Sequence, residues 1–94
     1  AAAAARNGVP SVRLGDAYAS YGRYPEAIAA FQQGLGKGGL DHPEEAKLHL
    51  GIAWLAAGER AKAASMLESV AGEGGARDLA QLWLMVQQTP AAAK

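Results

Sequence analysis

Hydrophobic and polar positions follow one another along this chain with the period of amphipathic helices. In five stretches, apolar residues return at i, i+3, i+4 and i+7, and Gly or Pro separates one stretch from the next. The pattern predicts helices at residues 11–21, 25–35, 41–57, 60–71 and 76–88. We therefore expect an all-α fold.

Each predicted helix has one apolar face, which we expect to be buried. The residues of these faces are Leu14, Ala17, Tyr18 and Tyr21; Ala27, Ala30, Phe31, Gly34 and Leu35; Leu50, Ala53, Trp54 and Ala57; Ala63, Met66, Leu67 and Val70; and Leu79, Leu82, Trp83 and Val86. The third helix has a second apolar stripe at Leu48, Ile52 and Leu55. A helix that is apolar nearly all round is covered, either by the first and fifth helices of this chain or by a partner.

Prolines and short polar residues predict where the helices begin. The residue before a proline avoids the α region, so Val9–Pro10 predicts a stop, with Ser11 as the N-cap of the first helix. Pro25 suits the first turn of the second helix, where its missing N–H needs no partner. Asp41 and Glu44 have the spacing of a capping box at the start of the third helix.

Glycines predict where the helices end. Gly22 and Gly58 are expected C-caps, and residues 34–39 and 72–75 read as glycine-rich breaks. A glycine-rich loop before a helix raises the question of phosphate binding. Residues 34–39 have neither a preceding strand nor a following Lys-Ser/Thr, so we interpret them as a plain loop. Thr89–Pro90 should end the last helix.

The chain repeats itself with a period of 36 residues, the difference between positions 15 and 51. The matching pairs are Leu14 and Leu50, Gly15 and Gly51, Ala17 and Ala53, Tyr18 and Trp54, Gly22 and Gly58, Ala27 and Ala63, and Phe31 and Leu67. A repeat of this length built from paired helices indicates a solenoid. Gly15 and Gly51 should lie where two helices cross closely.

This spacing of Leu-Gly-x-Ala-aromatic, Gly, Ala and a final aromatic or Leu closely resembles the tetratricopeptide repeat. The resemblance implies a right-handed superhelix of helix-turn-helix repeats and the job of holding another protein. The implied organisation is a tail or the end of a preceding helix at 1–8, repeat 1 at 9–39, repeat 2 at 40–75, a capping helix at 76–89 and a disordered tail at 90–94. We expect the chain to be part of a longer array.

In this family the first helix of each repeat lines a concave groove that holds the ligand. The positions that the resemblance assigns to the groove are Val9, Val12, Asp16, Ala19, Ser20, Glu45, Leu48, Ile52, Leu55 and Ala56. Of these we expect Val12, Asp16, Ala19, Glu45, Leu48, Ile52 and Leu55 to bind the partner. Family members that clamp a terminal carboxylate place Lys, Asn and Arg along the groove. Here an Asp stands at one of those places, which argues against a carboxylate clamp.

Composition and charge exclude several classes of partner. Nine basic and nine acidic side chains give zero formal net charge, so there is no electrostatic footprint for nucleic acid or an anionic membrane. No apolar run approaches the roughly 20 residues that span a bilayer. The absence of Cys leaves the redox compartment open, with the cytoplasm preferred.

Candidate chemistry is sparse. His42 and His49 lie near Glu45, but a zinc site needs three or four converging ligands, so we expect no metal, no cofactor and no enzyme activity. The aromatic residues fall on apolar stripes and are expected in the core rather than in a base-stacking platform. The leading hypothesis is a non-catalytic protein–protein interaction module. The alternative is a structural cap or self-association segment of a larger solenoid, without a ligand of its own.

Overall fold

The computed structural model describes residues 7–71 and 75–88, and within these ranges the chain is helical, with no strand. Its helices are α1 (Val9–Ser20), α2 (Tyr24–Lys37), α3 (Pro43–Ala56), α4 (Arg60–Glu68) and α5 (Gly75–Gln88). The predicted all-α class is confirmed. Predictions for residues 1–6, 72–74 and 89–94, which concern the two tails, the second glycine break and the C-terminal stop, lie outside the described residues.

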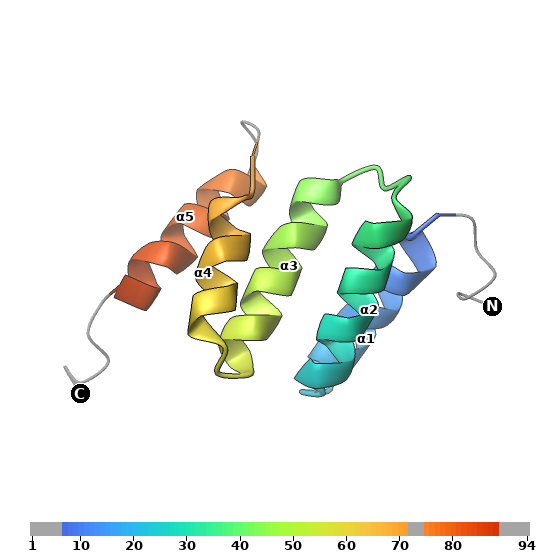
Figure 1. The fold of residues 1–94 in the computed structure, drawn as a ribbon, viewed down its shortest axis with the longest axis horizontal. Helices are drawn as coiled ribbons and strands as arrows, with labels where there is room; N and C mark the ends of the chain where they lie inside the picture. Colours follow the sequence, from blue (N-terminus) through green and yellow to red (C-terminus); the bar gives the residue numbers. More distant parts are fainter. Residues whose placement is uncertain (1–6, 72–74, 89–94) are drawn as a thin grey trace.

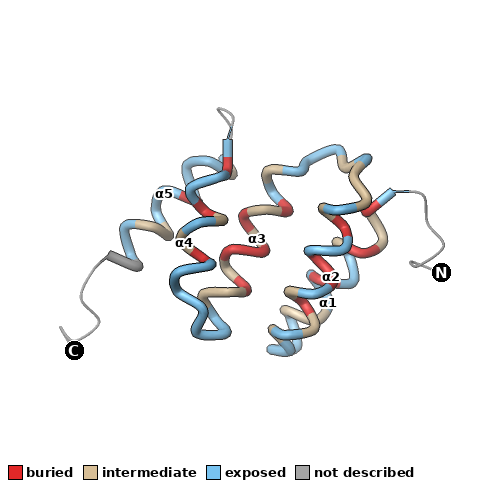
Figure 2. Tube along the Cα trace, in the orientation of Figure 1, coloured by how far each residue is buried: buried red, intermediate tan, exposed pale blue. Residues whose placement is uncertain are grey.

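The helices lie side by side, and successive helices run in opposite directions (Figure 1). α1 packs on α2, α3 packs on α4, and α5 lies against both α3 and α4. α3 is central, because it contacts each of the other four helices. Figure 2 shows buried positions along the length of α3. None of the helices in the described ranges is long and apolar enough to cross a membrane.

Two apolar clusters meet on α3. One joins α3 to α2 through Ala27, Phe31, Leu50 and Ala53. The other joins α3 to α4 and α5 through Leu48, Leu67, Val70 and Ala80. The two stripes expected on the third helix therefore both pack within this chain, and the second stripe is covered at Leu48.

α1 begins earlier than the sequence predicted. The helix starts at Val9 and holds Pro10 in its first turn, so the expectation that Val9 avoids the α region is wrong. A proline fits here because the first N–H groups of a helix have no intrahelical partner. The Val9 N–H donates instead to Asn7 Oδ1 at 3.1 Å, and the Gly8 carbonyl accepts the first hydrogen bond of the helix. Ser11 is not the N-cap, because it is buried inside the helix and its hydroxyl has no partner in the described ranges.

The apolar face predicted for α1 is largely wrong. Leu14 and Tyr21 are 43% and 82% exposed, and Ala17 is also exposed. The buried helical positions are the small residues Ser11 and Gly15. The reason is the closeness of α2, which leaves room for small side chains only between the two helices.

Gly15 and Gly51 lie at close helix crossings, as predicted. A Cβ atom at Gly15 would be 2.7 Å from Cδ1 of Phe31, and one at Gly51 would be 2.8 Å from Cδ2 of Leu67. Both neighbours are fully buried. The missing side chain of each glycine thus sets the approach of α1 to α2 and of α3 to α4.

α2 continues beyond the predicted end. It runs to Lys37 and stops at Gly38, whose φ of +75° lies in the left-handed region, so the break expected from residue 34 is wrong. Gly34 is buried, and a Cβ there would meet Val12 and the backbone of Gly8. It therefore serves packing rather than a turn. The predicted inward face is confirmed, with Ala27, Ala30, Phe31 and Gly34 buried and Leu35 partly buried.

The turns between paired helices agree with the sequence to within one residue. Gly22 and Gly58 have φ values of +76° and +89° and directly follow the C-cap residues Tyr21 and Ala57, so the predicted C-caps are one residue too late. Pro25 lies in the first turn of α2 and Pro43 in that of α3.

The capping box predicted at the start of α3 is wrong. His42 occupies the N-cap position, and no side chain caps the helix. Glu44 turns instead to the chain that follows α4, where its Oε1 accepts the N–H of Ala71 at 2.6 Å. Glu44 therefore accepts a hydrogen bond from the backbone of Ala71, which is remote in sequence. It does not accept one from the backbone at the start of α3, as the capping box predicted.

α4 ends at Glu68 rather than at residue 71. The Ser69 hydroxyl donates to the Met66 carbonyl at 2.6 Å, which satisfies one carbonyl of the last turn. The predicted inward face is otherwise confirmed, because Ala63 and Leu67 are buried and Val70 is buried just beyond the helix.

The apolar face predicted for α5 is wrong apart from Trp83. Ala80 is the buried contact of this helix, and Trp83 and Leu84 pack beside it. The other predicted members, Leu79, Leu82 and Val86, are 48%, 54% and 62% exposed. The side of α5 that carries Ala80, Trp83 and Leu84 packs on α3 and α4, so Leu82 and Val86 are left outside.

Candidate functional site

Three neighbouring cavities lie beside α3, and His49 lines all of them. The first, of about 230 Å³, is lined by Val9, Val12, Arg13, Asp16, Leu40, Asp41, His42, Glu45, Ala46 and His49. The second, of about 190 Å³, is lined by Asp16, Ala19, Tyr24, Phe31, His49, Ile52 and Ala53. The third, of about 300 Å³, is lined by Glu45, Leu48, His49, Gly75, Ala76 and Leu79. Because neighbouring cavities share residues, we describe them together as the α3 groove.

The spacing of α3 places its groove residues on one side of the helix. Glu45, His49 and Ile52 follow one another at i, i+4 and i+7, which brings them to a common face. α1 supplies the wall on one side, with Asp16, and α5 supplies the wall on the other, with Leu79. The groove therefore draws on the first helix of each pair and on the last helix.

His49 joins two walls of the groove. Its Nδ1 lies 2.9 Å from Asp16 Oδ1 of α1, but the atoms are not aligned for a hydrogen bond. The contact becomes an ion pair when the imidazole is protonated. The ring also stands edge-on to Phe31, with centroids 6.1 Å apart and planes at 61°. Half-buried packing thus fixes His49 in place, although the sequence suggested only an exposed polar residue.

The structure brings six of the seven predicted groove residues to this surface. Val12, Ala19 and Ile52 are half-buried, and Asp16 and Glu45 are exposed, so all five have surface that a ligand can reach. Two further residues behave differently.

Leu48 and Leu55 differ from these five residues, because neither offers exposed surface inside the groove. Leu48 borders the third cavity, but only 3% of its surface is exposed, so it forms the floor beneath α5. Leu55 is half-buried and borders none of the three cavities. Leu55 therefore lies outside the lining of the α3 groove, and Leu48 contributes to it only from its buried position.

Twelve lining residues were not assigned to the groove from the sequence: Arg13, Tyr24, Phe31, Leu40, Asp41, His42, Ala46, His49, Ala53, Gly75, Ala76 and Leu79. His49 had a signal, since it stands four residues after Glu45 and three before Ile52, but that spacing was weighed only as a metal pair. Leu79 had none, because its position depends on how α5 lies against α3.

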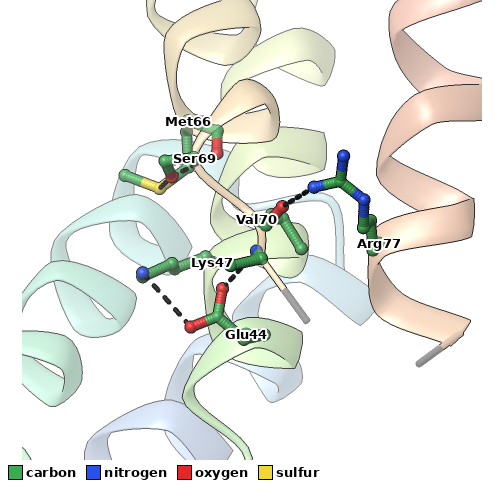
Figure 3. A network of polar contacts seen from close by, with 7 residues as sticks. Glu44, Lys47, Met66, Ser69, Val70 and Arg77 are labelled. Carbon is green, nitrogen blue, oxygen red and sulfur yellow. Dashed lines mark hydrogen bonds and ion pairs between the residues drawn. The ribbon is translucent and has the colours of Figure 1, made fainter. Parts of the chain in front are cut away.

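A polar network holds the α5 wall in position (Figure 3). Glu44 Oε2 lies 3.3 Å from Lys47 Nζ, while Oε1 accepts the Ala71 N–H. Arg77 of α5 donates to the Val70 carbonyl at 3.4 Å. The start of α3, the end of α4 and the start of α5 are thereby tied together.

The network lowers the pKa of Glu44. The hydrogen bond from the Ala71 N–H lowers the pKa of Glu44, with a smaller lowering from Lys47, against the opposing effect of burial. A lowered pKa means that the charged carboxylate is the form that the folded chain stabilises.

A larger depression, of about 380 Å³, lies elsewhere. Trp54 forms one side of it, and the rest comes from α4, including Lys62 and Ser65. Nearly all of its lining comes from α4 and the residue after it, and its few polar side chains do not point to a common centre. We therefore place the candidate site in the α3 groove.

Within residues 7–71 and 75–88, no group of three or more His, Asp or Glu side chains is placed to hold a metal ion. Comparison of the chain with family models, with curated proteins and with solved structures finds no match. The function is therefore inferred from the shape and chemistry of the α3 groove.

Proposed function

We propose that this chain is a non-catalytic protein–protein interaction module of tetratricopeptide type, which binds a segment of a partner protein in the α3 groove. In this proposal the two helix pairs are successive repeats of a right-handed solenoid, part of a longer array, and α5 is the helix that follows them. The 36-residue sequence period and the two glycines at matching helix crossings support it.

The observation that carries the proposal is the continuity of the groove across α1, α3 and α5. Its walls combine apolar side chains, including Val12, Tyr24 and Ile52, with a few polar ones. Grooves of this kind hold a helix or an extended peptide by its apolar side chains. Nothing in the groove has the arrangement of a nucleophile, a base and a third residue that orients the base, so catalysis is not part of the proposal.

Peptide display against the immobilised chain tests the proposal. Peptides selected from a random library are labelled with fluorescein, and their binding is measured by fluorescence polarisation. Ile52→Glu should abolish binding, because a partner's apolar side chain would have to desolvate the new charge. Since Ile52 is only half-buried, the melting temperature of the Ile52→Glu variant should fall by no more than a few degrees.

Lys62→Glu, in the depression beside Trp54, is the matched control and should bind the peptides as the unmodified chain does. Peptides that bind the Ile52→Glu chain with full affinity, but lose affinity for the Lys62→Glu chain, would move the site to that depression. A library that yields no specific peptide would count against the module.

The exposed apolar side of α5 favours a second candidate, a structural segment that packs on a further helix or on a second copy of the chain. Leu82, Met85 and Val86 are each more than half exposed there. Contiguous exposed apolar residues of this kind mark interaction surfaces. Concentration-dependent sedimentation, with no peptide bound in the α3 groove, would support this candidate over the first.

A further inference from the structure

The first cavity of the α3 groove has an uneven charge. The carboxylates of Asp16, Asp41 and Glu45 all line it, and among the described residues Arg13 is the one Lys or Arg in its lining. The chain as a whole has equal numbers of acidic and basic residues, so this excess is a local feature. Carboxylates gathered in a hollow beside apolar walls produce a negative potential that attracts a cationic group.

Two of these carboxylates are available to a ligand. In the part of the chain that the structure describes, neither the carboxylate of Asp41 nor that of Glu45 takes part in a hydrogen bond or an ion pair, and both residues are exposed. Asp16 differs from them, because its Oδ1 lies 2.9 Å from Nδ1 of His49. A basic side chain entering the cavity would meet negative charge that no neighbouring group has yet neutralised.

The second cavity, which shares Asp16 and His49 with the first, differs in character. Its remaining lining is apolar or aromatic, with Tyr24, Phe31 and Ile52 among the residues. A ligand that occupies both cavities must therefore present an apolar group directly beside a cationic one.

We infer that the partner segment bound in the α3 groove carries Lys or Arg next to a large apolar residue, with the basic group against Asp41 and Glu45. The inference rests on the proposed function and names its ligand class: a basic, amphipathic peptide segment. Charge complementarity of this sort sets specificity and the rate of association, and it disfavours acidic segments.

Two synthetic peptides test the inference. They have the same leucine positions and differ only in having lysine or glutamate at the positions between them. Fluorescence polarisation at low salt should show the lysine peptide binding at least about tenfold more tightly, a gap consistent with a few partly exposed charge pairs. Adding salt should narrow the gap, because exposed charges are screened.

Glu45→Lys should reduce or reverse this preference, whereas Glu59→Lys, outside the groove, should leave it unchanged. Both residues are exposed, so both variants should melt as the unmodified chain does. Equal binding of the two peptides, or tighter binding of the glutamate peptide, would overturn the charge inference and leave groove binding intact. Failure of both peptides to bind would overturn the inference together with the proposed function.

Discussion

Gly15→Ala adds one methyl group at the point where α1 crosses α2. The new Cβ would lie 2.7 Å from Cδ1 and 2.8 Å from Cε1 of Phe31, whereas packed carbon atoms are optimally about 3.5–4.0 Å apart. Both distances are too short for packed carbon atoms, so either the buried ring of Phe31 or the two helices must shift. Overpacking of this kind costs about 1–3 kcal/mol, and alanine regains about 1 kcal/mol over glycine inside a helix. The variant should lose up to about 2 kcal/mol of unfolding free energy.

Gly36→Ala is the matched control for this substitution. Gly36 is also helical, but a Cβ there meets nothing within 4 Å, so only the gain in helix propensity remains. Thermal unfolding followed by circular dichroism should show a lower melting temperature for Gly15→Ala and an equal or higher one for Gly36→Ala. In a domain of this size, each kcal/mol of unfolding free energy changes the melting temperature by about 4–8 °C. If Gly15→Ala melts at or above the control, α1 and α2 do not cross as described.

Three further changes follow from the packing around α3. The pKa of Glu44 is lowered in the folded chain, so its charged carboxylate stabilises the fold above the ordinary pKa of 4.5, and this stability is lost as the pH falls through the folded pKa. Acid titrations of the unfolding free energy should therefore be flatter for Glu44→Gln than for the unmodified chain. Leu48→Glu buries an unpaired charge and should abolish cooperative unfolding in circular dichroism. A chain that ends at residue 74 uncovers Leu48 and Val70, and light scattering should show aggregation; a monomer that melts cooperatively would contradict the role given to α5.

The number and order of the helices could be read from local signals. Gly22 and Gly58 adopt left-handed backbone angles that favour glycine, and Pro25 suits the first turn of a helix, so each acts within a few residues of sequence. Pro10 was misread because the same residue suits the start of one helix as well as the position after another. Its surroundings, with Asn7 bonded to the Val9 N–H, decide between the two.

The buried faces were harder to predict where helices pack most closely. Hydrophobic periodicity gives weight to large residues such as Leu14 and Leu82, yet both are exposed. The contacts are made by small residues, Gly15 and Ala80, whose value depends on the shape of a partner helix remote in sequence. For the same reason the groove was assigned in part, since the position of Leu79 follows only from the docking of α5 on α3.

The last prediction concerns the outward side of α5. It tests whether this apolar face is exposed to water or is covered by another chain. Leu82 and Val86 are more than half exposed, so charges there would meet water, and Leu82→Glu with Val86→Glu should change the unfolding free energy by no more than about 0.5 kcal/mol per site. Ala80→Glu, two residues earlier and 1% exposed, places the same charge in the packed side and should unfold the chain. Urea titration compares the three proteins. A large loss in the double variant at high chain concentration, absent on dilution, would mean that a second copy covers this face, because stability gained from association depends on concentration.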